Sequence, residues 1–501
     1  MESGSMIIIG AGVAGLSAGC YGRMNGFETT IFEMHDKPGG VCTSWKRKGY
    51  VFDGCIHWLV GSRPGSDFNR VWMELGALQG REIVDHEEFY RVEEPDGKTL
   101  IVYTDADRFE RHMKEMSPAD ARLIEKMMRD VRAMGKMVTP IGKPSGTVEG
   151  LRLALGTIPA IGPLMRWHGR TIRSLGAAFK DPFLREAFPR IFDLADFPMM
   201  AVLTTLAWLN SRDAGYPIGG SLEFARAIER RYLDLGGVVN YKSRVEKVLV
   251  EGDHAVGVRL ADGTEHRADT VISAADGHST VFEMLDGRYT DEEIRGYYAD
   301  LPLFEPLIQV SLGVFKDLSK EPHAVDFPLD EPLVAAGKVY RRITAQHYCF
   351  DPTLAPEGKS VVIVYLASDY DYWKVLSEDR KRYRAEKDEI ANRVIKALDV
   401  RFPGLRESVE VVDVATQITT ERYTGNLCAS FDGWLLTTKT SKYTVKQMKR
   451  ELPGLGDFFM IGQWLAPGGG LPPVALHGRQ VIQTICTRRK KPFVTSVPLP
   501  L

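Results

Sequence analysis

A glycine-rich stretch near the start of the chain, residues 6–40, constrains the possible folds more than any other part. It opens with an apolar run at residues 6–9, as expected for a buried parallel strand. The letters G-A-G-V-A-G follow with the spacing G-x-G-x-x-G, and a helix can begin within them. A second β-branched run, residues 28–32, ends at Glu33. This order of strand, glycine turn, helix, strand and acid predicts a βαβ unit that binds a dinucleotide.

The residues of this unit have distinct physical tasks. Gly10 permits the tight turn, Gly12 lets backbone approach a pyrophosphate, and Gly15 lets the helix pack against the strand. Ala14 lies in the first helical turn, where free N–H groups and the positive end of the helix dipole favour phosphate. Glu33, 18 positions after Gly15, is placed for unphosphorylated ribose, which favours FAD or NAD over NADP. A βαβ unit without any ligand is the structural alternative.

Composition limits the class of protein. The 501 residues can form two or three domains, and a net charge of −2 provides no general attraction for nucleic acid, so no nucleic-acid partner is expected. Six cysteines lack C-x-x-C spacing, which argues against a zinc site and is typical of a reducing compartment. No apolar run reaches 18 residues, so no spanning helix is expected. We therefore expect a cytoplasmic protein or one at the cytoplasmic face of a membrane.

A second strand–glycine–helix pattern occurs near the C-terminus. Residues 458–461 are apolar, and the letters A-P-G-G-G-L-P-P precede a helical pattern at residues 474–486. The N-terminus of that helix would stabilise negative charge on a reduced flavin. Because the chain has only one full fingerprint, we expect a single bound dinucleotide. FAD fits this site better than NAD, since both ends of the chain would close around a cofactor held through turnover.

The remaining elements indicate a second domain. A hairpin is predicted for residues 87–104 around P-D-G, and helices for 105–137, with Ser117 as N-cap before Pro118. The predicted fold class is α/β, a Rossmann-type FAD-binding domain with an inserted α+β substrate domain of antiparallel sheet plus helices. The FAD-binding domain would comprise residues 1–86, 215–299 and 408–501, and the substrate domain residues 87–214 and 300–407.

One segment of the predicted substrate domain, residues 151–173, is apolar, interrupted by glycine and proline, and includes four arginines. Basic residues bordering apolar ones are typical of a segment that lies on a membrane surface. The alternative is an ordinary surface helix pair whose arginines extend to water. The sequence therefore predicts peripheral membrane contact, assisted by the basic residues 488–491, without a spanning segment.

Several motifs together resemble the phytoene desaturase-like flavoproteins, a family that includes carotenoid cis–trans isomerases and retinol saturases. The motifs are IIIGAGVAGLSAG, IFEMHDKPGG, GYVFDGCIHWLVG, GGSLEFARAI, ISAAD, ERYTG and IGQWLAPGGGLPPVALHGRQ. They lie at both ends and in the middle of the chain, whereas most of the substrate domain has no recognisable motif. The resemblance implies bound FAD and a reaction on an apolar substrate. It does not specify a redox partner.

Site residues follow from the same resemblance. His57 would lie near the flavin, in a stretch similar to the family's F-D-x-G-x-H-Y-x-G. Cys55 and Trp58 depart from that pattern, as does Gln463, where related flavoproteins have an acid. The residues implied to touch FAD are Gly10, Gly12, Ala14, Gly15, Glu33, Gly39, Gly40, Val245, Gly462, Gly469, Gly470 and Leu471.

His57 is the candidate catalytic residue, because an imidazole can transfer protons near neutral pH. The alternative is a hydrogen-bonded structural histidine. His477 on the last helix could reach the flavin edge, and Arg422 and Tyr423 could flank the flavin or fix a loop. No metal site is expected.

Three functions fit these features. The first is an FAD-dependent oxidoreductase acting on carbon–carbon double bonds of an apolar polyene, isoprenoid or lipid, by desaturation, saturation or isomerisation. The second is a flavin-dependent amine oxidase. The third is a non-catalytic scaffold with the flavoprotein fold, which would predict degraded glycine motifs, whereas all are present.

Overall fold

The computed structural model describes residues 4–138, 141, 147–192, 194 and 196–498. A parallel five-stranded sheet contains both the first strand and the last strand of the described chain. Its order is β10-β2-β1-β14-β20. Residues 7 and 8, in its central strand, pair with residues 30 and 31 on one side and with 271 and 272 on the other. The strands are β1 (Ser5–Ile9), β2 (Glu28–Phe32), β10 (Val238–Asn240), β14 (Thr270–Ser273) and β20 (Phe458–Met460).

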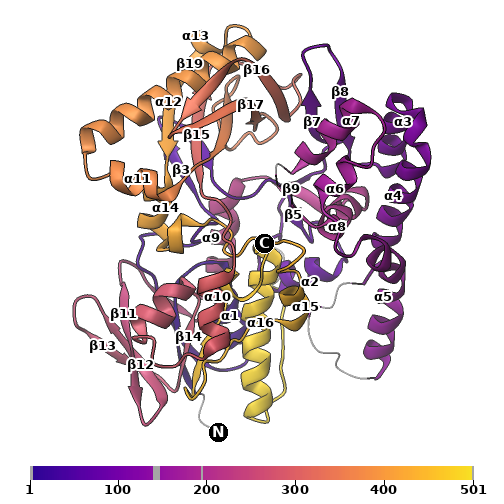
Figure 1. The fold of residues 1–501 in the computed structure, drawn as a ribbon. Helices are drawn as coiled ribbons and strands as arrows, with labels where there is room; N and C mark the ends of the chain where they lie inside the picture. The colour runs from indigo at the N-terminus through magenta and orange to yellow at the C-terminus, as the bar shows by residue number, and fades with distance from the viewer. Residues whose placement is uncertain (1–3, 139–140, 142–146, 193, 195, 499–501) are drawn as a thin grey trace.

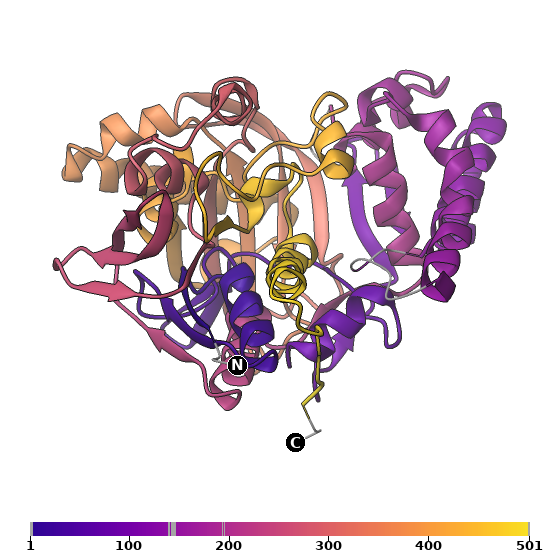
Figure 2. The ribbon, with the colours of Figure 1, turned by 90° about the horizontal axis from the view of Figure 1, so that it is seen from below.

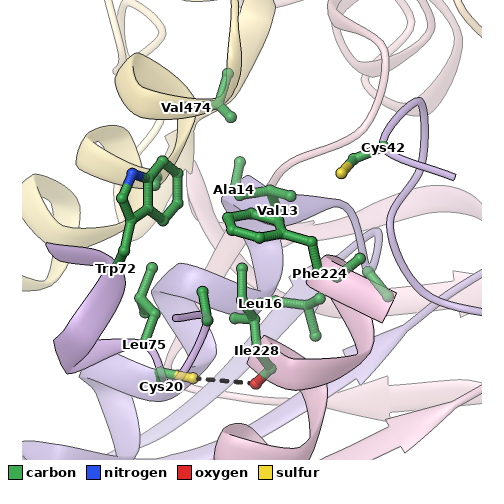
Figure 3. Close-up of a cluster of buried hydrophobic side chains, with 14 of the residues drawn as sticks. Val13, Ala14, Leu16, Cys20, Cys42, Trp72, Leu75, Phe224, Ile228 and Val474 are labelled. Carbon is green, nitrogen blue, oxygen red and sulfur yellow. Dashed lines mark hydrogen bonds between the residues drawn. The ribbon is translucent and has the colours of Figure 1, made fainter. Parts of the chain in front are cut away.

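Helix α1 (Val13–Met24) is buried between this sheet and three other helices. Figure 3 shows Val13 and Leu16 of α1 facing Phe224 of α9 (Gly220–Asp234) and Trp72 of α2 (Asp67–Glu74). The last helix, α16 (Leu471–Arg488), runs beside α1, and the two are seen nearly end-on in Figure 2. A Cβ added at Gly478 would meet the backbone nitrogen of Ala18 at 2.6 Å, so glycine permits this close packing.

A seven-stranded sheet forms the second half of the molecule, in the order β19-β15-β18-β17-β16-β7-β8. All its pairs are antiparallel except β16 with β7. One face is covered by the long helix α12 (Arg380–Arg401), seen at the upper left of Figure 1. The strands are β7 (Glu88–Glu93), β8 (Thr99–Tyr103), β15 (Leu307–Val314), β16 (Ala324–Ala335), β17 (Lys338–His347), β18 (Ser360–Ala367) and β19 (Val409–Ala415).

A helical layer, at the right of Figure 1, lies beyond β7 and β8 and shares a hydrophobic core with them. It comprises α3 (Ala106–Met116), α4 (Ala121–Met134), α5 (Thr147–Trp167), α6 (Ile172–Gly176), α7 (Pro182–Ala187) and α8 (Met199–Asn210). Two smaller sheets lie between the two halves: β3 (Ser44–Arg47) with β4 (Tyr50–Asp53), and β9 (Ala214–Pro217) between β5 (Leu59–Val60) and β6 (Ile83–Val84). A third, of β11 (Val245–Glu251), β12 (His254–Leu260) and β13 (Glu265–Arg267), packs against the parallel-sheet half and is seen at the lower left of Figure 1.

The fold class predicted from the sequence is confirmed, with three local differences. Strand β16 was not predicted, because its D-F-P-L-D-E-P stretch has the composition of a loop, and its pairing shifts register between Pro328 and Leu333. Strand β19 pairs with β15, although its residues were assigned to the cofactor side. Ser117 precedes a 3₁₀ turn, and its hydroxyl donates to Asp120 rather than capping backbone.

Candidate functional site

The glycine loop after β1 has the geometry that close packing requires. Gly10 has φ +96° and donates its N–H to the carbonyl of Phe32 at 2.8 Å. A Cβ on Gly15 would lie 2.0 Å from the Gly10 oxygen, so only glycine lets α1 approach the strand this closely. No side chain caps the N-terminus of α1, which begins after Gly12 and includes Ala14. Its first N–H groups therefore remain available for an anion.

Glu33 lies beside this loop at the end of β2. Its carboxylate accepts hydrogen bonds from the N–H of Ala11 at 2.7 Å and from the N–H of His35 at 2.8 Å. Burial raises the pKa of this carboxyl. The carbonyl of Glu33 also accepts the N–H of Ser243 at 2.8 Å, which brings Val245, at the start of β11, near the predicted ribose position.

The second glycine pair packs against the first loop. Gly39 donates its N–H to the carbonyl of Ala11 at 2.9 Å and forms a β-bridge with Gly12. Gly40 has φ +60°, and a Cβ there would lie 3.5 Å from the Gly12 Cα. The two glycine loops therefore form one surface of bare backbone.

The C-terminal glycines complete the same region. Gly462 has φ +107°, and a Cβ there would lie 3.8 Å from the Cβ of Ala14. The next side chain, Gln463, has a buried amide nitrogen with no hydrogen-bond partner within the described chain. An unpaired buried donor beside backbone glycines fits the hydroxyl or phosphate oxygens of a dinucleotide.

The loop before α16 differs from expectation in one respect. Gly470 donates its N–H to the Asp432 carboxylate at 2.8 Å, and burial raises the pKa of that carboxyl to about 7. Pro472 and Pro473 have no N–H, so Leu471 is the only residue among the first three of α16 that has one to offer. The helix dipole still favours negative charge there. Gly469 also packs against Asp432, which leaves no space for a Cβ.

A cavity of about 650 Å³ lies between the face of the seven-stranded sheet and the α3–α8 helices. Its interior is aromatic and apolar, with neutral polar groups, whereas its charged lining residues are all exposed. The interior includes His57, Trp58, His86, Phe89, Phe192, Tyr216, His323, Tyr348, Phe350 and Tyr365, and the charged rim includes Asp85, Glu87, Asp105, Arg108, Arg111, Arg212 and Glu305.

His57 lines the cavity, and hydrogen bonds link its neighbour Ile56 to the glycine loops. The N–H of its neighbour Ile56 donates to the Ser221 hydroxyl at 2.8 Å. The carbonyl of Ser221 accepts the thiol of Cys42 at 3.4 Å, and the N–H of Cys42 donates to Gly39 at 3.0 Å. A short chain of contacts thus joins the candidate catalytic residue to the predicted cofactor site.

The surroundings of His57 keep its imidazole neutral. Burial lowers its pKa to about 4. Its Nδ1 lies 3.5 Å from the hydroxyl of Tyr348, and its ring packs edge-on against Tyr365 with centroids 5.5 Å apart. At neutral pH the ring has one free lone pair and one N–H, so it can accept or donate a hydrogen bond at the cavity wall.

Asp53 is a buried residue beside the site that its sequence position did not indicate. Its carboxylate accepts the N–H groups of Gly54 at 2.8 Å and Ser221 at 3.1 Å, so it caps the N-terminus of α9. Burial raises its pKa to about 6. The available signal was an aspartate at the end of an apolar run, together with a glycine pair before a helix.

The weaker candidates have other surroundings. His477 is buried, hydrogen-bonded through Nδ1 to the carbonyl of Gly462 at 3.0 Å, and its pKa is lowered by burial to about 3. Arg422 lies over the ring of Tyr423, which packs edge-on against His35, so both lie near Glu33. Within the described residues, no group of three or more His, Cys, Asp or Glu side chains is arranged to hold a metal ion.

Comparison with known proteins gives consistent results. The family model described as flavin containing amine oxidoreductase matches residues 13–485. A chloroplastic prolycopene isomerase of Daucus carota is 23% identical over 99% of this chain and 82% of its own length. A neurosporene-forming phytoene desaturase of Rhodobacter capsulatus is 26% identical over 96% and 94%. A crystal structure of an oxidoreductase from Methanosarcina mazei, 18% identical, superposes with a TM-score of 0.61 over 96% of this chain and 100% of that one.

Proposed function

Because the chain belongs to the flavin containing amine oxidoreductase family, and so is an FAD-dependent oxidoreductase, we propose that it acts on carbon–carbon double bonds of an apolar polyene, isoprenoid or lipid. The single observation that carries this proposal is the 650 Å³ cavity, whose aromatic and apolar interior includes His57. That volume is within the roughly 300–1,000 Å³ of small-molecule sites. The relatives named for prolycopene and phytoene support the same substrate class.

FAD, when bound, supplies a two-electron acceptor or donor for hydride at the substrate carbon. The glycine loops at 10–15, 39–40 and 462 would hold its dinucleotide part, with Glu33 at the ribose. The loop before α16 would lie at the flavin. The aromatic walls of the cavity would orient the substrate and exclude water. His57, neutral at pH 7, would accept the proton that leaves the neighbouring carbon in a desaturation, with Tyr348 fixing the ring orientation.

An anaerobic mixing experiment tests this proposal. Purified protein containing FAD is mixed with an apolar polyene or with a primary amine, and the flavin absorbance near 450 nm is followed. We expect the polyene, presented in detergent, to change the flavin spectrum and the amine to leave it unchanged. Bleaching by the amine alone would replace this proposal with the amine oxidase function.

We also propose that α5 is a membrane-contacting surface through which an apolar substrate enters. Within the described residues, no helix has the length and apolar character needed to cross a membrane. However, α5 packs on α4 and α8 and leaves an apolar stripe exposed, with Met165 81% and Leu151 61% accessible. The helix continues through Pro159 and Pro163. The stripe comprises Leu151, Leu155, Ile158, Ile161, Leu164 and Met165.

Part of the positive charge expected to assist this contact is paired with carboxylates. Arg166 forms an ion pair with the buried Asp130 at 2.8 Å, and Arg173 lies 3.5 Å from Asp196. In the basic tail, Arg488 pairs with Glu451 at 2.7 Å, and Lys491 donates to the carbonyl of Asn25. The proposed contact therefore depends mainly on apolar area, and salt should weaken it little.

A further inference from the structure

Two of the cysteines lie opposite each other beyond the open end of the β3–β4 hairpin. The two strands pair in an antiparallel register, and the pairing continues with the N–H of Gly54, which donates to the carbonyl of Thr43 at 3.0 Å. One position further, the same register places Cys42 opposite Cys55. Because Gly54 and Thr43 share a hydrogen bond, the next position is of the non-hydrogen-bonded kind, where opposed Cα atoms are about 4.5 Å apart. A disulfide spans roughly 4.4–6.8 Å between Cα atoms, so this position is within the reach of one.

The side chains of these two cysteines are also in contact. A hydrogen bond with the Cys55 side chain, together with burial, raises the pKa of the Cys42 thiol. That thiol donates to the carbonyl of Ser221 at 3.4 Å, and the N–H of Ile56, next to Cys55, donates to the Ser221 hydroxyl at 2.8 Å. One serine therefore holds both cysteine segments in place, and the contact between the thiols is a fixed feature of the fold.

The two thiols differ in their access to solvent. Cys42 is 2% exposed, whereas Cys55 is partly exposed. A small oxidant can therefore reach Cys55 first, while the enclosed Cys42 is protected from direct attack. When an accessible cysteine is oxidised in contact with a second thiol, the second thiol displaces the oxygen from the first, and the reaction ends at a disulfide.

We propose that Cys42 and Cys55 are a redox-active pair, which a small peroxide converts to a reversible disulfide. The sulfur of Cys55 attacks one peroxide oxygen, so that an S–O bond forms, the O–O bond breaks, and the second oxygen leaves as water with the thiol proton. The sulfur of Cys42 then attacks the sulfur of Cys55, so that the S–S bond forms, the S–O bond breaks, and a second water leaves. The two thiols lose two electrons, and one hydrogen peroxide is reduced to two waters.

The position of this pair connects the two parts of the site. Cys42 follows the Gly39–Gly40 pair of the backbone surface, and Cys55 precedes His57 by two residues. The disulfide would therefore hold the second glycine loop and the segment of the candidate catalytic histidine at a fixed separation. An external thiol would reverse the bond by exchange. The proposal goes beyond the proposed function and does not depend on the substrate.

The test is peptide mapping of the FAD-containing protein. Protein reduced with dithiothreitol is desalted, treated with hydrogen peroxide at pH 8, blocked with N-ethylmaleimide in urea, and digested. Trypsin cleaves after Lys46, Arg47 and Lys48, so the two cysteines fall in separate peptides, residues 24–46 and 49–70, which only a disulfide can join. We expect most of peptide 49–70 to be linked to peptide 24–46, and dithiothreitol before blocking to free both. No linked peptide, or Cys55 linked to a different cysteine, would overturn the proposal.

Two serine variants make the test specific. Cys42→Ser keeps a donor for the Ser221 carbonyl but has no second thiol, so peroxide should leave Cys55 as a sulfenic acid that dimedone labels. Cys349→Ser is the matched control, because Cys349 is also partly exposed but its thiol contacts the Ser360 hydroxyl at 2.9 Å. It should give the same yield of linked peptide as the unmodified protein. Equal dimedone labelling of Cys55 in Cys42→Ser and in the unmodified protein would show that Cys42 does not displace the oxygen, and would overturn the proposal.

The measurement requires no substrate and no turnover. If polyenes leave the flavin spectrum unchanged but the peptides are linked, the proposed function fails and the redox pair stands. If polyenes change the spectrum but no linked peptide forms, the redox pair fails and the function stands.

Discussion

The glycine loops and the cavity are neighbouring regions built in opposite ways. The loops present backbone: Gly12, Gly40 and Gly462 form an edge where side chains are absent, beside the uncapped N–H groups at the start of α1. The cavity presents side chains, and two of them, His86 and Tyr365, have a buried polar atom without a partner within the described residues. A backbone surface binds the constant part of a cofactor, because every such cofactor has the same phosphates. A side-chain surface can select among substrates, because each exchange of one side chain alters what it accepts.

The largest expected effect comes from a substitution that blocks the backbone surface but leaves the fold intact. At Gly12, which has φ −65°, an added Cβ would have only one neighbouring atom within 4 Å, the Gly39 oxygen at 3.9 Å. Gly12→Val should therefore fold but occupy the space of the pyrophosphate. We expect no flavin in the purified protein and a loss of FAD affinity of about 100-fold or more, measured by fluorescence titration.

Gly15→Val is its control, because a Cβ there would collide with the Gly10 carbonyl. This variant should lose folded yield as well as flavin, as seen by circular dichroism. If Gly12→Val retains FAD while Gly15→Val folds normally, the cofactor does not lie on the loop between β1 and α1.

The next effect tests the side-chain surface. His57→Ala should keep its flavin and lose about 10- to 1,000-fold in turnover of a polyene, the range of a general base with some contribution from positioning. His477→Asn serves as a comparison, because His477 is buried against the Gly462 carbonyl and should alter stability more than rate. Normal turnover in His57→Ala would make His57 a structural residue.

A smaller effect concerns the exposed stripe of α5. Replacing Leu155 and Met165 by glutamate should reduce co-flotation with neutral phosphatidylcholine vesicles by about 10-fold, since two apolar side chains leave the lipid and two charges enter it. Glutamate at Arg132 on α4 would disturb its ion pairs with Asp107 and Glu110. A better control is therefore Val375→Glu, at an exposed apolar residue on α11 (Tyr370–Leu376). Equal flotation at 50 and 500 mM salt is expected. Strong salt dependence would contradict the apolar mechanism.

The smallest effect is on stability against pH. Burial lowers the pKa of His57 and His86 from 6.5 to about 4. Between pH 6.5 and 4 these two histidines therefore take up protons when the chain unfolds. The stability that the two neutral rings contribute is present above pH 6.5 and is lost as the pH falls towards 4. Burial raises the pKa of Asp53 to about 6, so protonation of Asp53 favours the folded state as the pH falls through the same range. We expect Tm to fall by about 2–4 °C from pH 7 to pH 5.

Asp53→Asn should make that decrease steeper, because it removes the opposing titration. His86→Asn should make it shallower. Differential scanning fluorimetry at several pH values measures both slopes. Identical slopes in all three proteins would show that these groups titrate alike in the folded and unfolded chain.

The contrast between the two regions also explains what the sequence could predict. The positions of Gly10, Gly15 and Glu33 follow from local spacing, because the glycine loop and both partners of the Glu33 carboxylate lie within residues 6–40, and the predicted fold class is confirmed. That these residues touch FAD remains a prediction. Asp53 and Tyr365 were not found, since their surroundings come from strands hundreds of residues apart and leave no spacing to recognise. Strand β16 was missed because pairing with β17 overrides its loop-like composition.

The contact between the first and last helices has a consequence for the order of synthesis. The Ser17 hydroxyl on α1 donates to the carbonyl of Ala475 on α16 at 2.7 Å, across 458 positions of the chain. Domains ordinarily begin to fold as their N-terminal residues leave the ribosome. Here the first βαβ unit lacks its covering helix until α16 has also been translated. The nascent chain must therefore wait, with α1 partly uncovered, until that helix can pack against it.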